Sequence, residues 1–462
     1  MTARRVAVWL SSGPATTVIA LGGAVVMAFL AVTLPDAAIG IALAPIVVTG
    51  LTWLVARRVR AHTDVAFLQG PFWAGVVLRV LAVGAQLVIG FIFYRGQVDF
   101  VGYWGLALQF VDRVVVDGRF DLLFDPAFIE DHFATRSTFI LAIVVALMML
   151  IVGPNIVALF LVGVPVSAAG AYLFYRAFEP FAPDAASRRR YALMLYLFPS
   201  VAFWSVFLGK DVWVFFLMGG TTLAMSRILH AVRIGPVLAL GVSLWIVTLL
   251  RPHVGGTLLL AVVASLALRP LRVRGPALYL RPVLQVGVTA GLLFGFTMVA
   301  ASALANIGVA ALTVEALADR AFMAHTGFAT TEGGSALPIA IDSRHPAAVA
   351  AFIPLGVATL LFRPFVWEAH NAVSMVAGLE NLFLLGFVLW RLPSLWRGVS
   401  MMRRYPMAVF VFFAFLATSV VLAFDWNLGA TQRHRTMVLP FLFMLMALPR
   451  GRAERAAAEV PA

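Results

Sequence analysis

The chain has 462 residues, of which 62% are hydrophobic and 12% charged, and its formal net charge is +13. A soluble domain of this length would carry about 25% charged residues, so the composition argues against a soluble globular fold. The chain has no cysteine, which excludes disulfide bonds, a thiolate nucleophile and a cysteine metal site. The positive charge is not a nucleic-acid signal, because the arginines cluster in short loops between apolar segments.

Apolar runs recur from one end of the chain to the other, as in a polytopic helical membrane protein. They cover residues 15–34, 39–56, 72–94, 137–152, 156–177, 191–208, 212–229, 234–250, 254–268, 283–305, 347–362, 372–390, 407–423 and 436–448. The first run is too long for the apolar core of a signal peptide, so we interpret it as a first span. Lys210 is the only lysine, and this preference for arginine suggests a GC-rich bacterial source.

Basic loops set the expected orientation, because cytoplasmic loops are enriched in arginine. The basic loops are Arg4–Arg5, Arg57–Arg60, Arg188–Arg190, Arg269–Arg281, Arg391–Arg404 and Arg450–Arg455. If all fourteen runs were full spans, the basic loops Arg188–Arg190 and Arg269–Arg281 would lie outside, against the positive-inside rule. This conflict disappears if 137–177 crosses the membrane an odd number of times and 347–362 is re-entrant. We therefore predict one all-α transmembrane domain, residues 1–462, with about twelve spans and both termini cytoplasmic.

Two long outer segments follow from this topology. The first, residues 95–136, contains a predicted helix from Phe100 to Val116 that can lie in the membrane interface. Its apolar stripe is formed by Trp104, Leu108, Val111 and Val115. The second outer segment, residues 306–345, holds a turn-rich stretch. No internal repeat and no soluble domain is evident.

Polar and charged residues that are not in basic loops gather at the predicted outer face. They are Asp99, Tyr103, Lys210, Asp211, Arg251, His253, Arg363, Glu368, Arg433, His434 and Arg435. Several cations facing a few carboxylates suit a phosphate or diphosphate, since arginine offers paired donors and lysine a point charge. Asp99 is a candidate general base at the membrane surface. Charged groups at membrane depth are rare and suggest function by default.

Each candidate also has a simpler explanation. Asp99 could be a solvated loop acid, Lys210 and Asp211 a neutralised pair, and Arg251 and Arg363 side chains that reach lipid headgroups. Arg433–Arg435 could be an ordinary outer loop. Glu380, deep in the run 372–390, is interpreted as structural and expected to face an arginine.

No nucleotide-binding or zinc pattern is present. A divalent cation held by Asp99 and a second outer carboxylate remains an alternative, because Mg²⁺ uses few protein carboxylates together with phosphate oxygens.

The start of the first outer segment, Asp99-Phe-Val-Gly-Tyr103-Trp104, resembles the Asp-x-x-x-Tyr opening of the first outer loop in GT-C-type glycosyltransferases. The strings around Phe198–Asp211, Leu250–His253 and Arg433–Arg435 are similar to those of bacterial envelope-polysaccharide membrane proteins of this broad type. The resemblance implies a GT-C-like fold and use of polyprenyl-phosphate sugars on the outer face. It also implies that Asp99 deprotonates the acceptor hydroxyl with Tyr103 beside it. Three of the predicted spans precede this segment, whereas the family usually has one span before the loop.

The leading hypothesis is therefore a bacterial inner-membrane glycosyltransferase. It would move a sugar from a polyprenyl phosphate or diphosphate to a glycan, lipid or protein acceptor at the outer face. A second hypothesis is a polysaccharide polymerase or ligase, in which Arg251, His253, Arg433 and His434 hold the diphosphate of an undecaprenyl-linked glycan. A third is a flippase or transporter of lipid-linked sugars, although transporters usually show repeats and polar sites at mid-bilayer depth.

Overall fold

The computed structural model describes residues 38–133, 135–268, 346–369, 371–423 and 428–450, which form helices and no strand. The chain divides into two compact units. Unit 1 comprises Met1–Arg176, Ala192–Gly220 and Leu249–Arg251, and unit 2 comprises Ala177–Tyr191, Thr221–Thr248 and Pro252–Ala462. The predicted runs 15–34 and 283–305, the loop 269–281, the outer segment 306–345 and both chain ends lie outside the described residues.

Every apolar run within the described residues contains helix, so the all-α prediction is confirmed. The main helices are α3 (Ala38–Arg60), α4 (Val65–Val88), α7 (Arg136–Val152), α8 (Ile156–Phe178), α11 (Lys210–His230), α12 (Ile234–Leu250), α13 (Pro252–Leu268), α16 (Pro346–Phe362), α17 (Ala372–Trp390), α19 (Pro406–Leu422) and α21 (Leu439–Met446). The bounds of α12 and α17 equal the predicted ones. Continuous apolar sequence therefore identifies these helices well.

Four described helices are long and apolar enough to cross a bilayer, which supports a helical membrane protein. They are Val65–Phe93, α8, α11 and α17, where the first joins α4 to the π-helical turn η2 (Ile89–Phe93). A fifth is added if α6 (Pro126–His132) and α7, which meet at 90°, form one broken span. Ile234–Leu250, Pro252–Ala267, Ala351–Phe362 and Pro406–Leu422 are shorter apolar helices. The number of spans, about twelve, stays a prediction.

The predicted run 191–208 is not one helix, and this expectation was wrong. It forms α9 (Ala185–Leu197) and α10 (Pro199–Trp204), because Pro199 lacks the amide hydrogen that would continue the first helix. Carbonyl groups near the carboxyl ends of α9 and α10 accept hydrogen bonds from side chains of α4. Arg79 Nη1 donates to the Tyr196 carbonyl at 3.2 Å, and Gln86 Nε2 donates to the Phe203 carbonyl. Irregular backbone at membrane depth requires such internal partners.

Gly75 allows α4 to approach α9 closely enough for these contacts. A Cβ atom at this position would lie 3.0 Å from Tyr196 Cβ and 3.0 Å from the Tyr196 carbonyl oxygen. Arg79, one turn further along α4, also donates from Nε to Ser167 Oγ of α8 at 2.7 Å. Its side chain is fully buried. In unit 1, α4 is therefore joined to α8 and α9 through one arginine.

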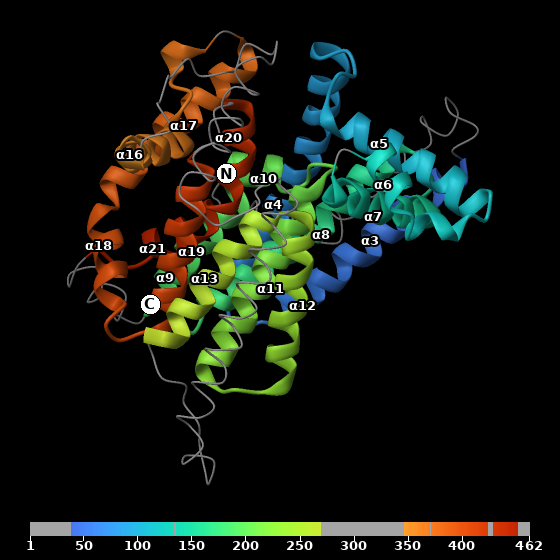
Figure 1. Cartoon of the computed structure of the whole chain (residues 1–462). Coiled ribbons are helices and arrows are strands. Elements are labelled where there is room, and N and C mark those ends of the chain that lie inside the picture. Colours follow the sequence, from blue (N-terminus) through green and yellow to red (C-terminus); the bar gives the residue numbers. More distant parts are fainter. Residues whose placement is uncertain (1–37, 134, 269–345, 370, 424–427, 451–462) are drawn as a thin grey trace. The chain divides into compact units, whose positions relative to one another are not determined.

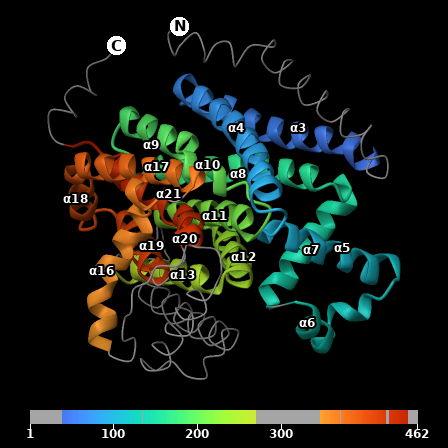
Figure 2. The same ribbon diagram turned by 90° about the horizontal axis from the view of Figure 1, so that it is seen from above.

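The first outer segment is helical over the predicted stretch, as α5 (Asp99–Phe110) continued by the π-helical η3 (Val111–Val116). The 3-10 turn η4 (Phe120–Leu123) and α6 follow, and α5 packs beside α7 (Figure 2). Trp104 Nε1 donates to the Pro154 carbonyl at 2.6 Å, which holds α5 to the turn between α7 and α8.

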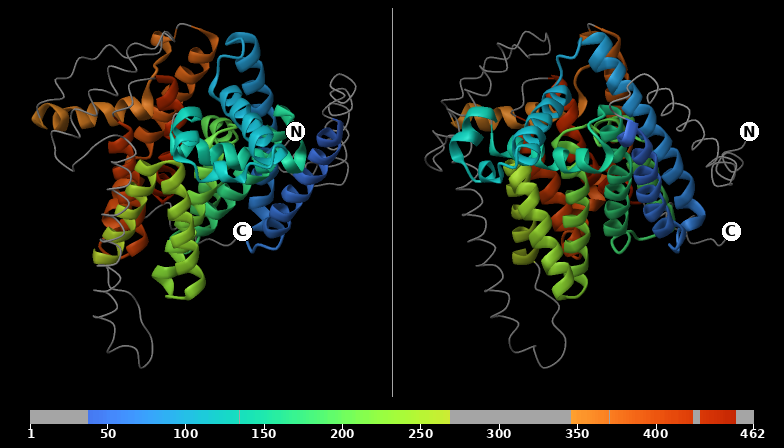
Figure 3. Two further views of the ribbon diagram at one scale, coloured as in Figure 1. Left: turned by 45° about the vertical axis from the view of Figure 1, so that its right-hand side comes forward. Right: turned by 90° about the vertical axis from the view of Figure 1, so that its right-hand side faces the viewer.

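The buried stripe of α5 and η3 differs from the predicted one. Phe100, Ala107, Phe110 and Val114 are buried, whereas the predicted stripe, Trp104, Leu108, Val111 and Val115, is only half-buried. The reason is aromatic packing, because the Phe100 ring contacts Phe160 at 5.0 Å and the Phe110 ring contacts Phe139 at 6.0 Å between centroids. The same unit contains the adjacent helices α3 and α4, drawn in blue in Figure 3.

Unit 2 is organised around α13 and α19, which lie side by side (Figure 1). Thr257 Oγ1 and Thr418 Oγ1 are 2.9 Å apart, and Ser265 Oγ donates to the Pro406 carbonyl at 2.9 Å. The helices α16, α18 (Leu392–Met401) and α21 also pack against α19. The sequence predicted a basic loop at Arg391–Arg404, the segment that contains α18. The short elements η6 (Val366–Glu368), α20 (Leu428–His434) and η7 (Arg435–Met437) carry predicted site residues.

Candidate functional site

Lys210 connects the amino-terminal ends of two helices in unit 1. It is the first residue of α11, and its half-buried side chain donates from Nζ to Ser137 Oγ at 2.7 Å and to Thr138 Oγ1 at 3.4 Å. Both hydroxyl groups lie in the first turn of α7, whose N-cap is Thr135. Helix amino ends carry partial positive charge, and they favour anions. The ammonium group and two helix ends thus produce a locally electropositive position.

Asp211 has a buried partner of its own. Arg251 Nη2 donates to Asp211 Oδ1 at 2.7 Å, and the two side chains are 9% and 1% exposed. Arg251 therefore balances the charge of Asp211, and its buried position argues against a side chain that reaches lipid headgroups.

Asp99 and Tyr103 lie on the first and second turns of α5 in unit 1. Asp99 is exposed and Tyr103 is half-buried. An acid in the first turn stabilises the helix through the helix dipole, so the position of Asp99 has a structural explanation as well as the catalytic one. The four-residue spacing places both side chains on one face of α5.

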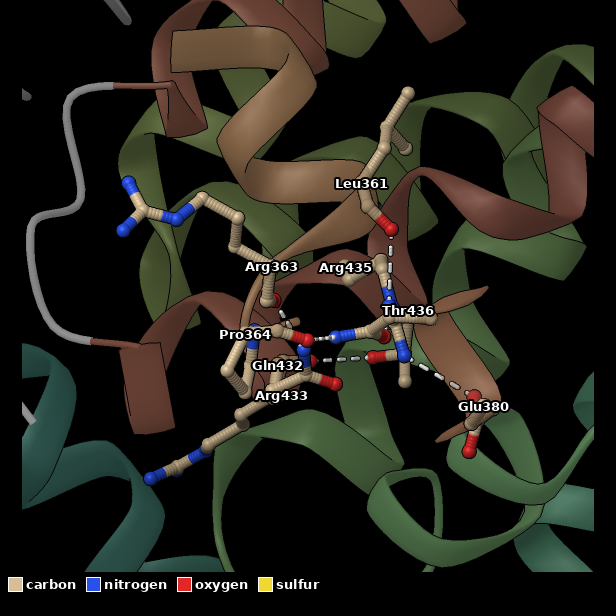
Figure 4. A network of polar contacts seen from close by, with 9 residues as sticks. Leu361, Arg363, Pro364, Glu380, Gln432, Arg433, Arg435 and Thr436 are labelled. Atoms are coloured by element: carbon tan, nitrogen blue, oxygen red, sulfur yellow. Dashed lines mark hydrogen bonds and ion pairs between the residues drawn. The ribbon is translucent and has the colours of Figure 1, made fainter. Parts of the chain in front are cut away.

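In unit 2, the carboxyl end of α16 and the cis-peptide turn Arg363–Pro364 are held by a polar network (Figure 4). Its hydrogen bonds run from Arg435 Nη1 to the Leu361 carbonyl (3.0 Å), from Gln432 Nε2 to the Arg363 carbonyl (2.6 Å), and from Asn381 Nδ2 to the Pro364 carbonyl (2.8 Å). Arg435 also donates to Asn381 Oδ1. Side chains of α17, α20 and η7 therefore fix the backbone from which Arg363 projects.

Arg435 occupies the centre of this network rather than a surface. Its side chain is 0% exposed, and Nη2 pairs with Glu380 Oε1 at 3.0 Å. The expectation that Glu380 faces an arginine is confirmed. The described contacts of the Arg435 guanidinium are thus with protein groups. Arg435 therefore supports the backbone near Arg363 and Arg433.

Arg363 and Arg433 extend away from the network in Figure 4, whereas Arg435 points into it. Arg363 Nε donates to Glu368 Oε2 at 3.1 Å, and Nη2 pairs with Oε1. Burial favours the neutral form of the Glu368 carboxyl, but hydrogen bonds from Arg363 and from the Phe365 amide outweigh it and hold the pKa of Glu368 below its ordinary value. Glu368 therefore positions the Arg363 guanidinium as an ionised partner.

The imidazole rings of His253 and His434 lie together, with centroids 6.5 Å apart and planes at 61°. His253 is exposed, and both His434 and the preceding Arg433 are half-exposed. The structure thus brings together residues far apart in the sequence, at the start of α13 and the end of α20. Neutral or protonated imidazoles beside an arginine offer hydrogen-bond donors to an anion.

Sequence reasoning missed several polar residues. Arg79, within the run 72–94, was detectable as an arginine in the middle of a predicted span. Ser137 and Thr138 stand at the start of another run, but nothing in the sequence connects them with Lys210. His62 and Asp64 lie in the turn between α3 and α4, where the Asp64 amide donates to His62 Nδ1 at 3.0 Å.

No protein-family model, curated protein or solved structure matches this chain. The class that the described residues define is an α-helical membrane protein with two groups of polar residues, one in each unit. The resemblance to GT-C-type enzymes therefore stays a hypothesis.

Proposed function

We propose that the chain is a bacterial inner-membrane glycosyltransferase of about twelve spans, with both termini cytoplasmic and its chemistry on the outer face. It transfers a sugar from a polyprenyl phosphate or diphosphate to a glycan, lipid or protein acceptor. The chain must hold the phosphate of the carrier. A carboxylate must act as the base that deprotonates the acceptor hydroxyl.

The position of Lys210 carries the proposal. Lysine is an unfavourable residue at the first position of a helix, because its charge opposes the helix dipole. Its ammonium group also meets the first turn of α7, and Asp211 is already bound by Arg251. A phosphate oxygen is the anion that two helix amino ends and an ammonium group accommodate.

Asp99 is the proposed general base. It is exposed on the same unit as Lys210, on an outer helix that Trp104 fixes to the turn after α7. Tyr103 shares its face of α5. In unit 2, Arg363, Arg433 and the His253–His434 pair supply further hydrogen-bond donors that are suited to phosphate oxygens.

The His253–His434 pair beside Arg433 favours one alternative, a polymerase or ligase that uses diphosphate-linked glycans. In that reaction the arginines and histidines of unit 2 hold the leaving diphosphate, and a carboxylate acting as general base is not essential. The two candidates therefore differ in their dependence on Asp99.

The decisive experiment compares Asp99→Asn with Asp112→Asn in liposomes supplied with a polyprenyl-phosphate sugar and with an acceptor glycan that bears free hydroxyl groups. Asp112 is exposed on the same helical segment, in η3, and serves as the matched control. Loss of a general base should lower the release of polyprenyl phosphate by about 10²–10⁴-fold, while the control stays at the wild-type rate. Full activity of Asp99→Asn would remove the proposed base and favour the diphosphate-dependent polymerase.

A further inference from the structure

Two arginines donate three hydrogen bonds to carbonyl groups at the carboxyl end of α21 in unit 2. Arg391 donates from Nε to the Met446 carbonyl at 2.9 Å and from Nη2 to the Leu448 carbonyl, and Arg190 donates from Nε to the Ala447 carbonyl at 3.0 Å. Cations are favourable at helix carboxyl ends. Residues from two basic loops, far apart in sequence, therefore meet at one helix end.

Helix α18 begins directly after Arg391 and presents two different faces. Ser394 and Gly398, one turn apart, are buried, and a Cβ atom on Gly398 would lie 2.7 Å from Leu445 Cδ2 of α21. Leu392 and Trp396, also one turn apart, are 50% and 76% exposed. The helix thus packs on α21 with small residues and exposes an apolar face with a tryptophan.

Arginines lie at both ends of α18. The guanidinium groups of Arg391 and Arg450 lie 5.3 Å and 4.7 Å from the ring centroid of Trp390, which is itself 52% exposed. Arg403 and Arg404 follow α18 and are exposed. We define Leu392, Trp396, Trp390, Arg403, Arg404 and Arg450 as the α18 surface.

Acidic residues are few among the described residues of unit 2. The described part of unit 2 has four acidic residues, Glu179, Asp184, Glu368 and Glu380. Two of them pair with Arg363 and Arg435. An amphipathic helix with tryptophan and leucine on one side and arginines at its end is typical of segments that lie in the bilayer interface. Arginine clusters of this kind attract anionic lipids.

We propose that the α18 surface is a docking site for anionic phospholipid headgroups of the bilayer in which the chain is embedded. Trp396 and Leu392 enter the boundary between headgroups and acyl chains, and Arg403, Arg404 and Arg450 bind headgroup phosphates. Local charge complementarity selects the anionic lipid over a zwitterionic one. This inference is independent of the proposed glycosyl transfer, because α18 carries none of the residues assigned to it.

The test uses the absence of cysteine in the native chain. Ser400→Cys, exposed near the end of α18, is labelled with a lipid-sensitive fluorophore and placed in vesicles of mixed phosphatidylcholine and phosphatidylglycerol. One of the two lipids carries brominated acyl chains, which quench the fluorophore on contact. Preferential binding predicts that brominated phosphatidylglycerol quenches roughly twofold more strongly than brominated phosphatidylcholine at equal fractions.

The variant Arg403→Gln/Arg404→Gln should bring the two quenching efficiencies close to equality. Arg113→Gln/Arg119→Gln removes the same charge from exposed positions of the first outer segment and should leave the preference unchanged. All proteins are first shown to be monodisperse in detergent. Equal quenching by both lipids in the wild-type background, no quenching by either, or an equal loss of preference in both double variants would overturn the proposal.

Discussion

At the residue scale, the most informative arrangement is that the side chains of the consecutive residues Lys210 and Asp211 contact different partners. Successive residues of a helix point about 100° apart, so they do not face each other. Asp211 can therefore pair with Arg251 in a buried position while Lys210 reaches the first turn of α7. The two charges of this dipeptide serve different contacts.

Replacing Lys210 by arginine tests whether its ammonium group has a specific role. If Lys210 is a phosphate ligand confined between two helix ends, the longer planar guanidinium should fit poorly, and transfer from a polyprenyl-phosphate sugar should fall about tenfold or more. Arg60→Lys, at the exposed end of α3, is the control and should retain wild-type turnover. Wild-type turnover of Lys210→Arg with normal membrane expression would return Lys210 to a structural role.

The lowered pKa of Glu368 predicts that the stability of the protein depends on pH. Its pKa is lower in the folded protein than its ordinary value of 4.5, so the Arg363–Glu368 pair contributes stability that is complete above that value. The contribution is lost as the pH falls through the lower folded-state pKa. The difference in melting temperature between the wild type and Glu368→Gln should therefore narrow on acidification below 4.5. A difference that stays constant across this range would show that the pair does not stabilise the fold.

At the scale of the elements, the break between α9 and α10 depends on a close approach at Gly75. A methyl group there meets Tyr196 Cβ and the Tyr196 carbonyl oxygen, neither of which can rotate away. We predict that Gly75→Ala lowers the free energy of unfolding by about 1–3 kcal/mol. Gly84→Ala, on the same helix with nothing within 4 Å of its Cβ position, should instead raise it by about 0.5–1 kcal/mol.

Thermal unfolding in detergent micelles, followed by circular dichroism, compares the two alanine variants directly. Both replacements add the same methyl group to α4, so the difference isolates the contact with α9. Equal shifts for both variants would contradict the packing argument.

The sequence predicted helices better than the contacts between them. The runs 234–250 and 372–390 coincide with α12 and α17, because a uniformly apolar helix needs no knowledge of its neighbours. The division at Pro199 and the amphipathic α18 were missed, since each depends on a packing partner far away in sequence. For the same reason, Arg435 was predicted as a substrate ligand, although its guanidinium lies buried against Glu380.

At the scale of the whole molecule, topology is the property that the proposed function needs most. The predicted topology places Arg433 on the outer side, and it places Arg189, in a basic loop, on the cytoplasmic side. Single cysteines at these positions are unambiguous because the native chain has none. An impermeant maleimide added to intact cells should label Arg433→Cys and should label Arg189→Cys only after permeabilisation. Labelling of both positions from the same side would reject the outward-facing chemistry.

The arginine at the centre of α4 also has a consequence for biogenesis. Arg79 lies midway along the apolar helix Val65–Phe93, yet its hydrogen-bond acceptors on Ser167 and Tyr196 come 88 and 117 residues later in the chain. At ordinary translation rates Ser167 is synthesised roughly 4–18 s, and Tyr196 roughly 6–23 s, after Arg79 itself. During this interval the arginine has no tertiary partner from either residue, and a central arginine opposes insertion by about 2.5–3.5 kcal/mol. Helix α4 should therefore remain beside the translocon, entering lipid only when α8 and α9 arrive.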